Sequence, residues 1–454
     1  MIISPKGLAI AKRMILASAV RMAQPLGNLL QPHCGVTRNL HYLRMPGDEP
    51  QIPAITGRFK VCFAEPSEAS VDPGRGPVSM ACCGTGSTFE AAALPALAEM
   101  LERISAASFH PDCFTLASAH ELGELALDLT GLPVCSAAEL QHPKCRLVRP
   151  DPDAKIHWTK GIDLHCGKDV FLPAVMVHTH LSTLPAERFW LQCTSGCAAH
   201  ISYEKAVASA IFELLERDAI SIVWLQQMAL PRIEVDVIPS ELMPHWKSYE
   251  SSSRHLEFHF YNATNDLGVP IVYALRRSAQ DAEVSTMVAC AAADRIETAL
   301  TKALRDLTVS RQGFRTIREH PDSWHDFHAT HHGASLMSRA EVGSAFDFLL
   351  NSAQSQKLST LLALRPTEQT LDLKSLIQAL KKARMRAYVA DLTGEEARSV
   401  GFRVVRVLVP ALQPISFSYA ARFLANPRLY ELPQRLGFPA HSEPEINPWP
   451  QPFY

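Results

Sequence analysis

Residues 204–217 read EKAVASAIFELLER and repeat the pattern of residues 90–103, which read EAAALPALAEMLER. A third copy, ETALTKALRDLTVS at residues 297–310, has an aspartate where the other two have their first internal glutamate. The shared pattern is Glu-x-Ala-x-x-x-Ala-x-x-acid, and successive copies start 114 and 93 residues apart. That distance is too long for a solenoid repeat and favours one supersecondary unit used three times.

Each copy predicts an amphipathic helix whose acid stands above small side chains. Residues four, seven and eleven apart share one helix face, so Glu99 aligns with Ala92 and Ala96, opposite a ridge of leucines. Glu213 and Asp306 stand above alanines in the same way. The first two copies add a second glutamate three residues later, and like charges at that spacing repel unless a cation neutralises them. A solvated Glu–Arg surface is one reading, but the repetition favours carboxylate faces that converge on magnesium, which prefers oxygen ligands.

Short loops that contain glycine precede the first two of these helices. They read CGTGS at residues 83–87 and CTSGC at residues 193–197. Backbone N–H groups in such loops can approach an anion near the start of a helix. The chain contains no GxxxxGK[ST] motif, so the sequence predicts a phosphate site of a different kind from a P-loop.

The remaining sequence predicts a mixed α/β (α+β) fold. Helical and β-rich segments alternate along the chain without a low-complexity linker. We therefore expect a single domain over residues 35–454, preceded by a basic N-terminal arm over residues 1–34. Pro95 removes a backbone donor inside the first helix and predicts a kink or a late helix start. The expected helices lie at 90–108, 204–228, 296–312 and 372–385, and the expected strands at 170–177, 269–275 and 402–409.

Composition excludes several classes of protein. The 454 residues include 44 Lys+Arg and 46 Asp+Glu, with 47% hydrophobic residues, which is ordinary for a folded protein and unlike a disordered or collagenous one. A net charge of −2 argues against a surface built for nucleic acid. No apolar run reaches the ~18 residues of a membrane-spanning helix, so we expect no membrane association.

The cysteines and the N-terminus bear on the compartment. The chain has 11 cysteines, an odd number without CxxC spacing, which favours reduced thiols in the cytoplasm over a disulfide framework. No acidic residue precedes Asp48, and Lys12 and Arg13 interrupt the apolar stretch that a signal peptide needs. A basic arm is the preferred interpretation, while an organellar transit peptide stays open on composition alone.

Two further metal sites are less favoured. Cys82 and Cys83, or Cys193 and Cys197, could bind a metal, although zinc sites usually show tighter CxxC pairs. Five histidines gather in residues 320–332, where an irregular surface insertion is the simpler interpretation.

Long segments of the chain resemble the YcaO superfamily. GTGSTFEAAALPALAEMLERISA, TSGCAAHISYEKAVASAIFELLERDAI and IETALTKALRDLTVSR are similar to its three nucleotide-binding helices. GFRVVRVLVPALQPISF and NPRLYELPQRLGF resemble the C-terminal half of discrete YcaO cyclodehydratases of the thiazole/oxazole-forming peptide maturase group. The sequence WPQPFY at residues 449–454 follows Pro448 and is similar to the PxPxP tail of that group.

The resemblance implies a YcaO fold, with β-sheets packed against helices, and an enzyme that uses ATP and Mg2+. It implies that a Cys, Ser or Thr side chain of a ribosomally made precursor peptide attacks the preceding amide, that the amide oxygen is phosphorylated, and that loss of phosphate leaves an azoline. The metal candidates implied by the resemblance are Glu99, Glu102, Glu213, Glu216 and Asp306. The candidates for binding ATP are Gly84, Thr85, Gly86, Arg103, Ser195, Gly196, Arg217 and Lys302. Pro448, Pro450 and Pro452 would order the active site, since proline stiffens an extended segment.

The resemblance also implies partners. The residues before Gly35 are too few for a leader-binding module, so we expect a separate partner protein that recruits the leader of the precursor peptide. A homodimer is expected, and an azole pathway would add a flavin dehydrogenase.

Several positions depart from the family pattern. Thr85 and Ser195 stand where lysine and asparagine are usual, Lys302 and Asp306 replace arginine and glutamate, and two residues follow the last proline. Lysine offers a point charge in place of a planar fork. Two alternatives therefore remain: a YcaO enzyme that forms thioamides or amidines, and a degenerate subunit that serves as a non-catalytic scaffold.

Overall fold

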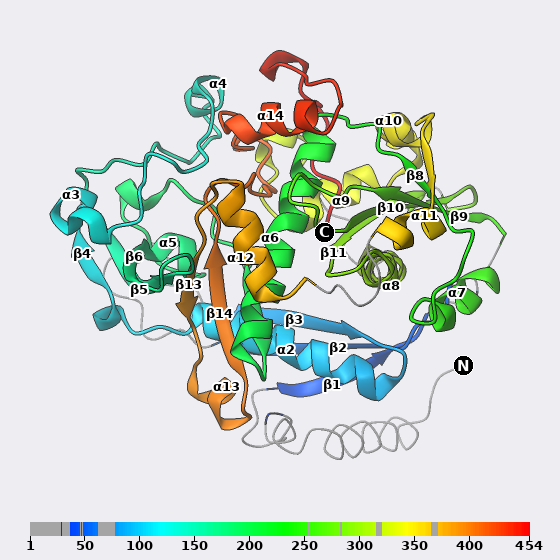
Figure 1. The fold of residues 1–454 in the computed structure, drawn as a ribbon, viewed down its shortest axis with the longest axis horizontal. Coiled ribbons are helices and arrows are strands. Elements are labelled where there is room, and N and C mark those ends of the chain that lie inside the picture. Colours follow the sequence, from blue (N-terminus) through cyan, green and yellow to red (C-terminus); the bar gives the residue numbers. More distant parts are fainter. Residues whose placement is uncertain are drawn as a thin grey trace.

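Three β-sheets, each packed against one of the repeated helices, form the described part of the protein (Figure 1). This computed structural model describes residues 29, 37–45, 47, 49–61, 78–252, 254–281, 284–314, 320–364 and 371–454. The predicted basic arm at residues 1–34 lies outside the described residues except for Leu29. The predicted mixed α/β class is confirmed.

The first sheet is an antiparallel meander of three strands, and the other two sheets draw strands from distant parts of the chain. The first sheet has the order β1 (Thr37–Leu43), β2 (Ala54–Val61), β3 (Val78–Thr85). The second has the order β11 (Thr286–Ala292), β10 (Ile271–Ser278), β9 (Leu256–Asn262), β8 (Arg232–Glu234), β12 (Ser355–Lys357). The third has the order β4 (Thr115–Ala117), β5 (Ile156–Asp163), β13 (Tyr388–Asp391), β14 (Arg403–Leu408), β7 (Cys197–His200), with β6 (Asp169–Pro173) paired to β5.

The repeated segments form the three long helices. They are α2 (Phe89–Ala107), α6 (Tyr203–Leu225) and α8 (Ile296–Phe314). The hydroxyls of Thr88 and Ser202 cap the first two, each accepting a backbone N–H from three residues ahead, which satisfies a donor that a helix start leaves free. Each helix follows a strand and packs on it, α2 on β3, α6 on β7 and α8 on β11.

Each long helix also organises its own hydrophobic cluster. Leu97 and Leu101 of α2, Val207 and Ile211 of α6, and Leu300 of α8 are all at most 1% exposed, in three separate clusters. In Figure 1, α6 runs through the middle of the molecule, between β14 and β11, and it packs on both strands. The supersecondary unit predicted from the repeat is therefore a strand followed by an acidic helix with its own core.

Shorter helices connect these units. They are α3 (Ala119–Leu122), α4 (Ala137–Gln141), α5 (Ala174–Val177), α7 (Met243–Glu250), α9 (Thr330–Met337), α10 (Asp347–Leu350), α11 (Leu358–Leu364), α12 (Leu373–Lys382), α13 (Glu395–Ser399) and α14 (Pro427–Arg435). Within the described ranges, no helix is both long and apolar enough to span a bilayer.

Two local predictions were wrong. The strand expected over residues 170–177 ends at Pro173, and Ala174–Val177 forms a short buried helix instead, because a run of buried apolar residues has the same sequence signal in either state. Of the two outcomes expected from Pro95, the late start is wrong, since the first long helix runs through Pro95 from Phe89, and the kink remains a prediction. In addition, Leu94 of the expected leucine ridge is 48% exposed.

Candidate active site

The first acid of each complete repeat is tied to the strand or loop ahead of its own helix. A carboxylate oxygen of Glu99 accepts a hydrogen bond from the Cys83 N–H at 2.7 Å, and Glu213 accepts one from the Gly196 N–H at 3.0 Å. Each glutamate also pairs with the arginine four residues later in its helix, at 2.7 and 3.3 Å. Small alanines on this helix face permit the close approach to the strand, as the sequence predicted.

The second acid of each complete repeat reaches the next repeat. Glu102 accepts a hydrogen bond from the Ala199 N–H in β7 at 2.9 Å, and Glu216 accepts one from the Ala292 N–H in β11 at 3.2 Å. Ala199 and Ala292 hold the same place in their units, 14 residues before Glu213 and before Asp306 respectively. The repeats are thus linked in series, because each of these carboxylates accepts a hydrogen bond from the strand that precedes the next repeated helix.

This series of carboxylates stops at the third helix. The position three residues after Asp306 is Val309, and the residue 14 positions before Glu99 is Thr85. A valine side chain accepts no hydrogen bond, so α8 has no acid at the position from which Glu102 and Glu216 cap their neighbours. The backbone N–H of Thr85, at the end of β3, therefore has no equivalent of Glu102 or Glu216 in the repeat pattern.

The acids lie close enough to perturb one another. Burial and the Glu213 carboxylate raise the pKa of Glu102 well above its usual value. Burial raises the pKa of Glu216 to about 7, with contributions from Glu213 and Asp306. Burial also raises the pKa of Asp306 to about 6, and the Glu99 carboxylate adds to the effect. The five predicted acids therefore gather into one cluster, which we call the acidic cluster, with more negative charge than the protein solvates well.

Asp306 combines an exposed surface with a desolvated charge. Its side chain is open to solvent, yet burial is the main cause of its raised pKa. Both observations hold for a carboxylate on a concave wall, where water reaches the side chain but protein surrounds it, and ligand sites have this shape. Because the Asp306 side chain is exposed, a ligand can reach its carboxylate.

Cations from three elements balance part of this charge. Burial lowers the pKa of Arg217, but the carboxylates of Glu216 and Glu213 outweigh it and hold the pKa above its usual value. Arg103 contacts Glu99, and its buried Nε has no hydrogen-bond partner within the described part of the chain. Lys302 of α8 is exposed and lies near enough to Asp306 to lower its pKa. The predicted cations therefore border the acidic cluster.

Sequence reasoning missed a fourth cation. Arg406 of β14 is 2% exposed and donates to the Cys193 carbonyl at 2.7 Å and to the Cys197 sulfur at 3.2 Å. The charge of Glu213 reaches it. The only sequence signal was a charged residue at the centre of an apolar strand, which is uncommon unless the charge is paired.

The glycines of the two segments predicted as loops have packing roles, although the first prediction was partly wrong, because residues 83–85 form the end of strand β3. A Cβ at Gly84 would lie 2.1 Å from the Ala92 carbonyl oxygen, and one at Gly86 would lie 2.6 Å from the Ala92 nitrogen. Gly196 has φ of 85°, and a Cβ there would lie 2.6 Å from the Val407 carbonyl oxygen. Glycine is needed here for close packing of strand and helix. The binding of phosphate by Thr85, Ser195 and these glycines stays a prediction.

The tail, which we define as residues 447–454, is held by the C-terminal half of α6. The Trp224 indole donates to the Trp449 carbonyl at 3.1 Å, and the Asn447 amide donates to the Trp224 carbonyl at 2.9 Å. The Tyr419 hydroxyl donates to the Pro448 carbonyl at 2.7 Å. One rigid helix therefore carries both the second pair of acids and the tail.

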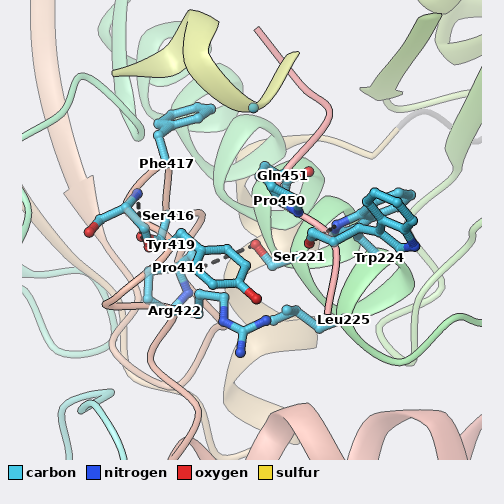
Figure 2. A pocket seen from close by; sticks show the side chains of 13 residues that line it. Ser221, Trp224, Leu225, Pro414, Ser416, Phe417, Tyr419, Arg422, Pro450 and Gln451 are labelled. Atoms are coloured by element: carbon cyan, nitrogen blue, oxygen red, sulfur yellow. Dashed lines mark hydrogen bonds between the residues drawn. The ribbon is translucent and has the colours of Figure 1, made fainter. Parts of the chain in front are cut away.

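A pocket lies beside the tail (Figure 2). Its walls come from α6, the loop at residues 414–422 and the tail itself, including Pro450. The Ser221 hydroxyl on its α6 wall donates to the Pro414 carbonyl at 3.1 Å (Figure 2). Pro448, Pro450 and Pro452 form the stiff part of the tail, and their predicted role in ordering the site remains a prediction.

The other metal sites considered on sequence do not assemble. Within the described ranges, no three or more His, Cys, Asp or Glu side chains are gathered closely enough to hold a metal ion by themselves, and this holds for the acidic cluster as well. The His332 ring contacts the rings of His328 and His331 edge-to-face, and His332 is buried in α9. The nine cysteines in the described part of the chain are free.

Mg2+ nevertheless fits the acidic cluster. Magnesium usually takes one or two carboxylates together with substrate phosphates and waters, not a cage made only of protein groups. Desolvated oxygen donors with raised pKa values and bordering cations match that requirement.

Comparisons with solved structures show what the fold of this chain is similar to. The chain resembles a heterocyclase solved in complex with substrate and cofactor, with a TM-score of 0.76 and 20% identity over 96% of this chain and 57% of that one. It resembles YcaO from Methanopyrus kandleri bound with AMPPCP and Mg2+, with a TM-score of 0.59 and 18% identity over 88% and 91%. It also resembles the E. coli microcin synthetase McbBCD complex with pro-MccB17 bound, with a TM-score of 0.58 and 14% identity over 91% and 96%.

These likenesses establish the fold, and the chain spans little more than half the length of the heterocyclase. No curated protein matches the chain. A sequence model of the family described as YcaO cyclodehydratase, binding ATP and Mg2+, matches residues 83–413, which include all five acids of the acidic cluster. The chain belongs to the YcaO cyclodehydratase family.

Proposed function

We propose that this chain is the ATP-dependent cyclodehydratase subunit of a peptide-modifying synthetase. The reaction converts Cys, Ser or Thr of a ribosomal precursor peptide to an azoline. The side-chain sulfur or oxygen bonds to the preceding carbonyl carbon, the former amide oxygen takes the γ-phosphoryl group of ATP, and its bond to carbon breaks as phosphate leaves. The protons of the attacking group and of the amide N–H are lost.

The observation that carries this proposal is the acidic cluster formed by three repeated helices. Its members come from α2, α6 and α8, and three of its carboxyl groups have raised pKa values. A bound divalent cation stabilises the charged form of such groups and offsets charge on a transferring phosphoryl group. The metal-holding residues we propose are Glu99, Glu102, Glu213, Glu216 and Asp306.

The protein supplies positioning and charge. Arg103 and Arg217 already pair with the first acids of their repeats and can turn to phosphate oxygens, because a guanidinium donates through several N–H groups. Lys302 adds a point charge from α8. The end of β3 with Gly84 and Thr85, the adjoining Gly86, and the loop that contains Ser195 and Gly196 would approach the nucleotide.

A nucleotide-binding experiment tests the cofactor site without any peptide. We expect AMPPCP with Mg2+ to bind the wild-type chain, and Glu213→Gln to weaken binding by at least about tenfold, as loss of a group around a metal typically does. Glu204→Gln is the matched control, because Glu204 is exposed in the first turn of the same helix. Equal affinities for the two variants would refute the assignment of the acidic cluster.

The activity itself is tested with the cognate precursor peptide and partner. Loss of one water from the peptide per modified residue, with release of phosphate, supports azoline formation. A gain of sulfur would point to the thioamide alternative instead. Nucleotide binding without any peptide change would support the scaffold alternative, which the substitutions at Thr85, Ser195, Lys302 and Asp306 motivate.

Further components follow from the same proposal. The microcin synthetase that this chain resembles is a complex that contains its precursor, pro-MccB17, so we propose a partner that recruits the leader peptide. A homodimer and a flavin dehydrogenase that oxidises azolines are parts of the proposed system. Nine free cysteines support placement in the reducing cytoplasm.

A further inference from the structure

The acidic cluster is open to solvent between α2 and α8. Glu99 and Arg103 of α2 keep 31% and 36% of their side-chain surface exposed, and Asp306 of α8 is exposed as well. On α6, Glu213 and Arg217 keep 27% and 30%, and Glu216 keeps 17%. The cluster is therefore partly exposed along all three helices, with the larger exposed fractions on α2 and α8.

Tyr454 stands at this opening. Its ring lies against Phe314 of α8, with ring centroids 5.6 Å apart. The charges of Arg103, Glu99 and Arg58 influence the pKa of its phenol, so the ring also lies near α2 and β2. The side chain is 54% exposed, so one face packs on α8 and the rest borders the entrance.

The tail holds Tyr454 in place from the preceding residues. Phe453 is 5% exposed and packs edge-to-face on Tyr273 of β10, with centroids 5.3 Å apart. The Gln451 backbone lies so close to α9 that a Cβ on Gly333 would be 2.3 Å from the Gln451 carbonyl oxygen. With Trp449 fixed to α6, the ring of Tyr454 has little freedom to leave the entrance.

We propose that Tyr454 is a positioning residue that limits the access of water to the acidic cluster and so favours transfer of the phosphoryl group to the peptide. This inference rests on the proposed function. The ring limits the approach of water whether or not peptide is bound, and when peptide is bound the amide oxygen takes the phosphoryl group and later leaves as part of phosphate. When the ring is missing, a water oxygen attacks the γ-phosphorus, the bond to ADP breaks, and the water protons pass to phosphate and solvent. Exclusion of water by a closing element is a general way to prevent this hydrolysis.

The origin of the phosphate oxygen reports the difference directly. In water labelled with heavy oxygen, phosphate from coupled turnover carries the unlabelled amide oxygen, whereas phosphate from hydrolysis carries label. We expect Tyr454→Ala to raise the labelled fraction several-fold and to raise hydrolysis of Mg2+-ATP without peptide by a similar factor. Affinity for AMPPCP with Mg2+ should change less than about twofold, since the acids and cations are intact. Tyr454→Phe should match the wild type because it keeps the ring.

Two further variants control for general effects. Phe453→Ala loosens the anchor and should behave like Tyr454→Ala, while Tyr203→Ala removes a partly exposed tyrosine at the start of α6 and should leave the labelled fraction unchanged. An unchanged labelled fraction and hydrolysis rate in Tyr454→Ala would overturn the inference, as would a large loss of AMPPCP affinity. If wild-type phosphate is always labelled and the peptide is unmodified, the proposed function fails instead. Hydrolysis without peptide then still decides the role of Tyr454.

Discussion

Glu216 offers a test of the acidic cluster that needs no substrate. Its carboxylate accepts hydrogen bonds from the Ala292 N–H and from Arg217, yet burial and the neighbouring Glu213 and Asp306 raise its pKa from 4.5 to about 7. An acid with a raised pKa in the folded protein destabilises the fold once it ionises. The contribution of Glu216 to the free energy of unfolding is therefore most favourable below the pKa that this group has in the unfolded chain. It becomes unfavourable as the pH rises through the pKa that the group has in the folded protein.

The size of the effect follows from the shift. Each unit of pKa corresponds to about 1.4 kcal/mol, so a rise from 4.5 to about 7 costs at most about 3.5 kcal/mol at high pH. Between about pH 5 and about pH 8 the loss amounts to roughly 2–3 kcal/mol. Replacing the carboxylate by an amide of the same shape removes this titration. It also removes one charged partner of Arg217, but the ion pair between Arg217 and Glu213 remains.

The experiment compares thermal stability of ligand-free wild type and Glu216→Gln at these two pH values. We expect the wild type to lose more stability than the variant on going to the higher pH, by roughly 2–3 kcal/mol. Glu204→Gln, on the exposed first turn of the same helix, should follow the wild type. Mg2+ with AMPPCP should restore wild-type stability at the higher pH, because a cation favours the ionised carboxylate. Equal pH dependence of wild type and Glu216→Gln would refute the reasoning.

Three other substitutions test the framework around the acidic cluster, each by thermal unfolding. Gly84→Ala should destabilise by about 1–3 kcal/mol or more, because its Cβ would lie 2.1 Å from a backbone oxygen of α2; a neutral result would show that α2 can move. Arg428→Met should cost about 3–5 kcal/mol, because Nε and Nη2 of Arg428 donate hydrogen bonds to the fully buried Asp218 carboxylate of α6; a gain in stability would contradict this. Asn447→Ala should cost about 1–3 kcal/mol, because it removes both the hydrogen bond that the Asn447 amide donates to the Trp224 carbonyl and the one that its Oδ1 accepts from the Trp449 N–H, and limited proteolysis should then cut the tail sooner than in the wild type.

The sequence by itself determined the repeated helices and which residues on them are acidic. Helical periodicity and caps act within about one or two turns, so α2, α6 and α8 lie within three residues of their expected bounds. The same locality explains the failure at Ala174–Val177, where only tertiary packing separates a buried helix from a buried strand.

The tertiary structure decided how the repeats are joined and what the acids experience. The bonds from Glu102 to Ala199 and from Glu216 to Ala292 join residues 97 and 76 positions apart, and the raised pKa values come from burial that no local pattern encodes. Arg406 and Tyr454 reach the site only because β14 and the tail pack beside α6 and α8. Local spacing could name the acids, but charge and burial are sums over neighbours from the whole chain, and only the folded arrangement brings those neighbours together.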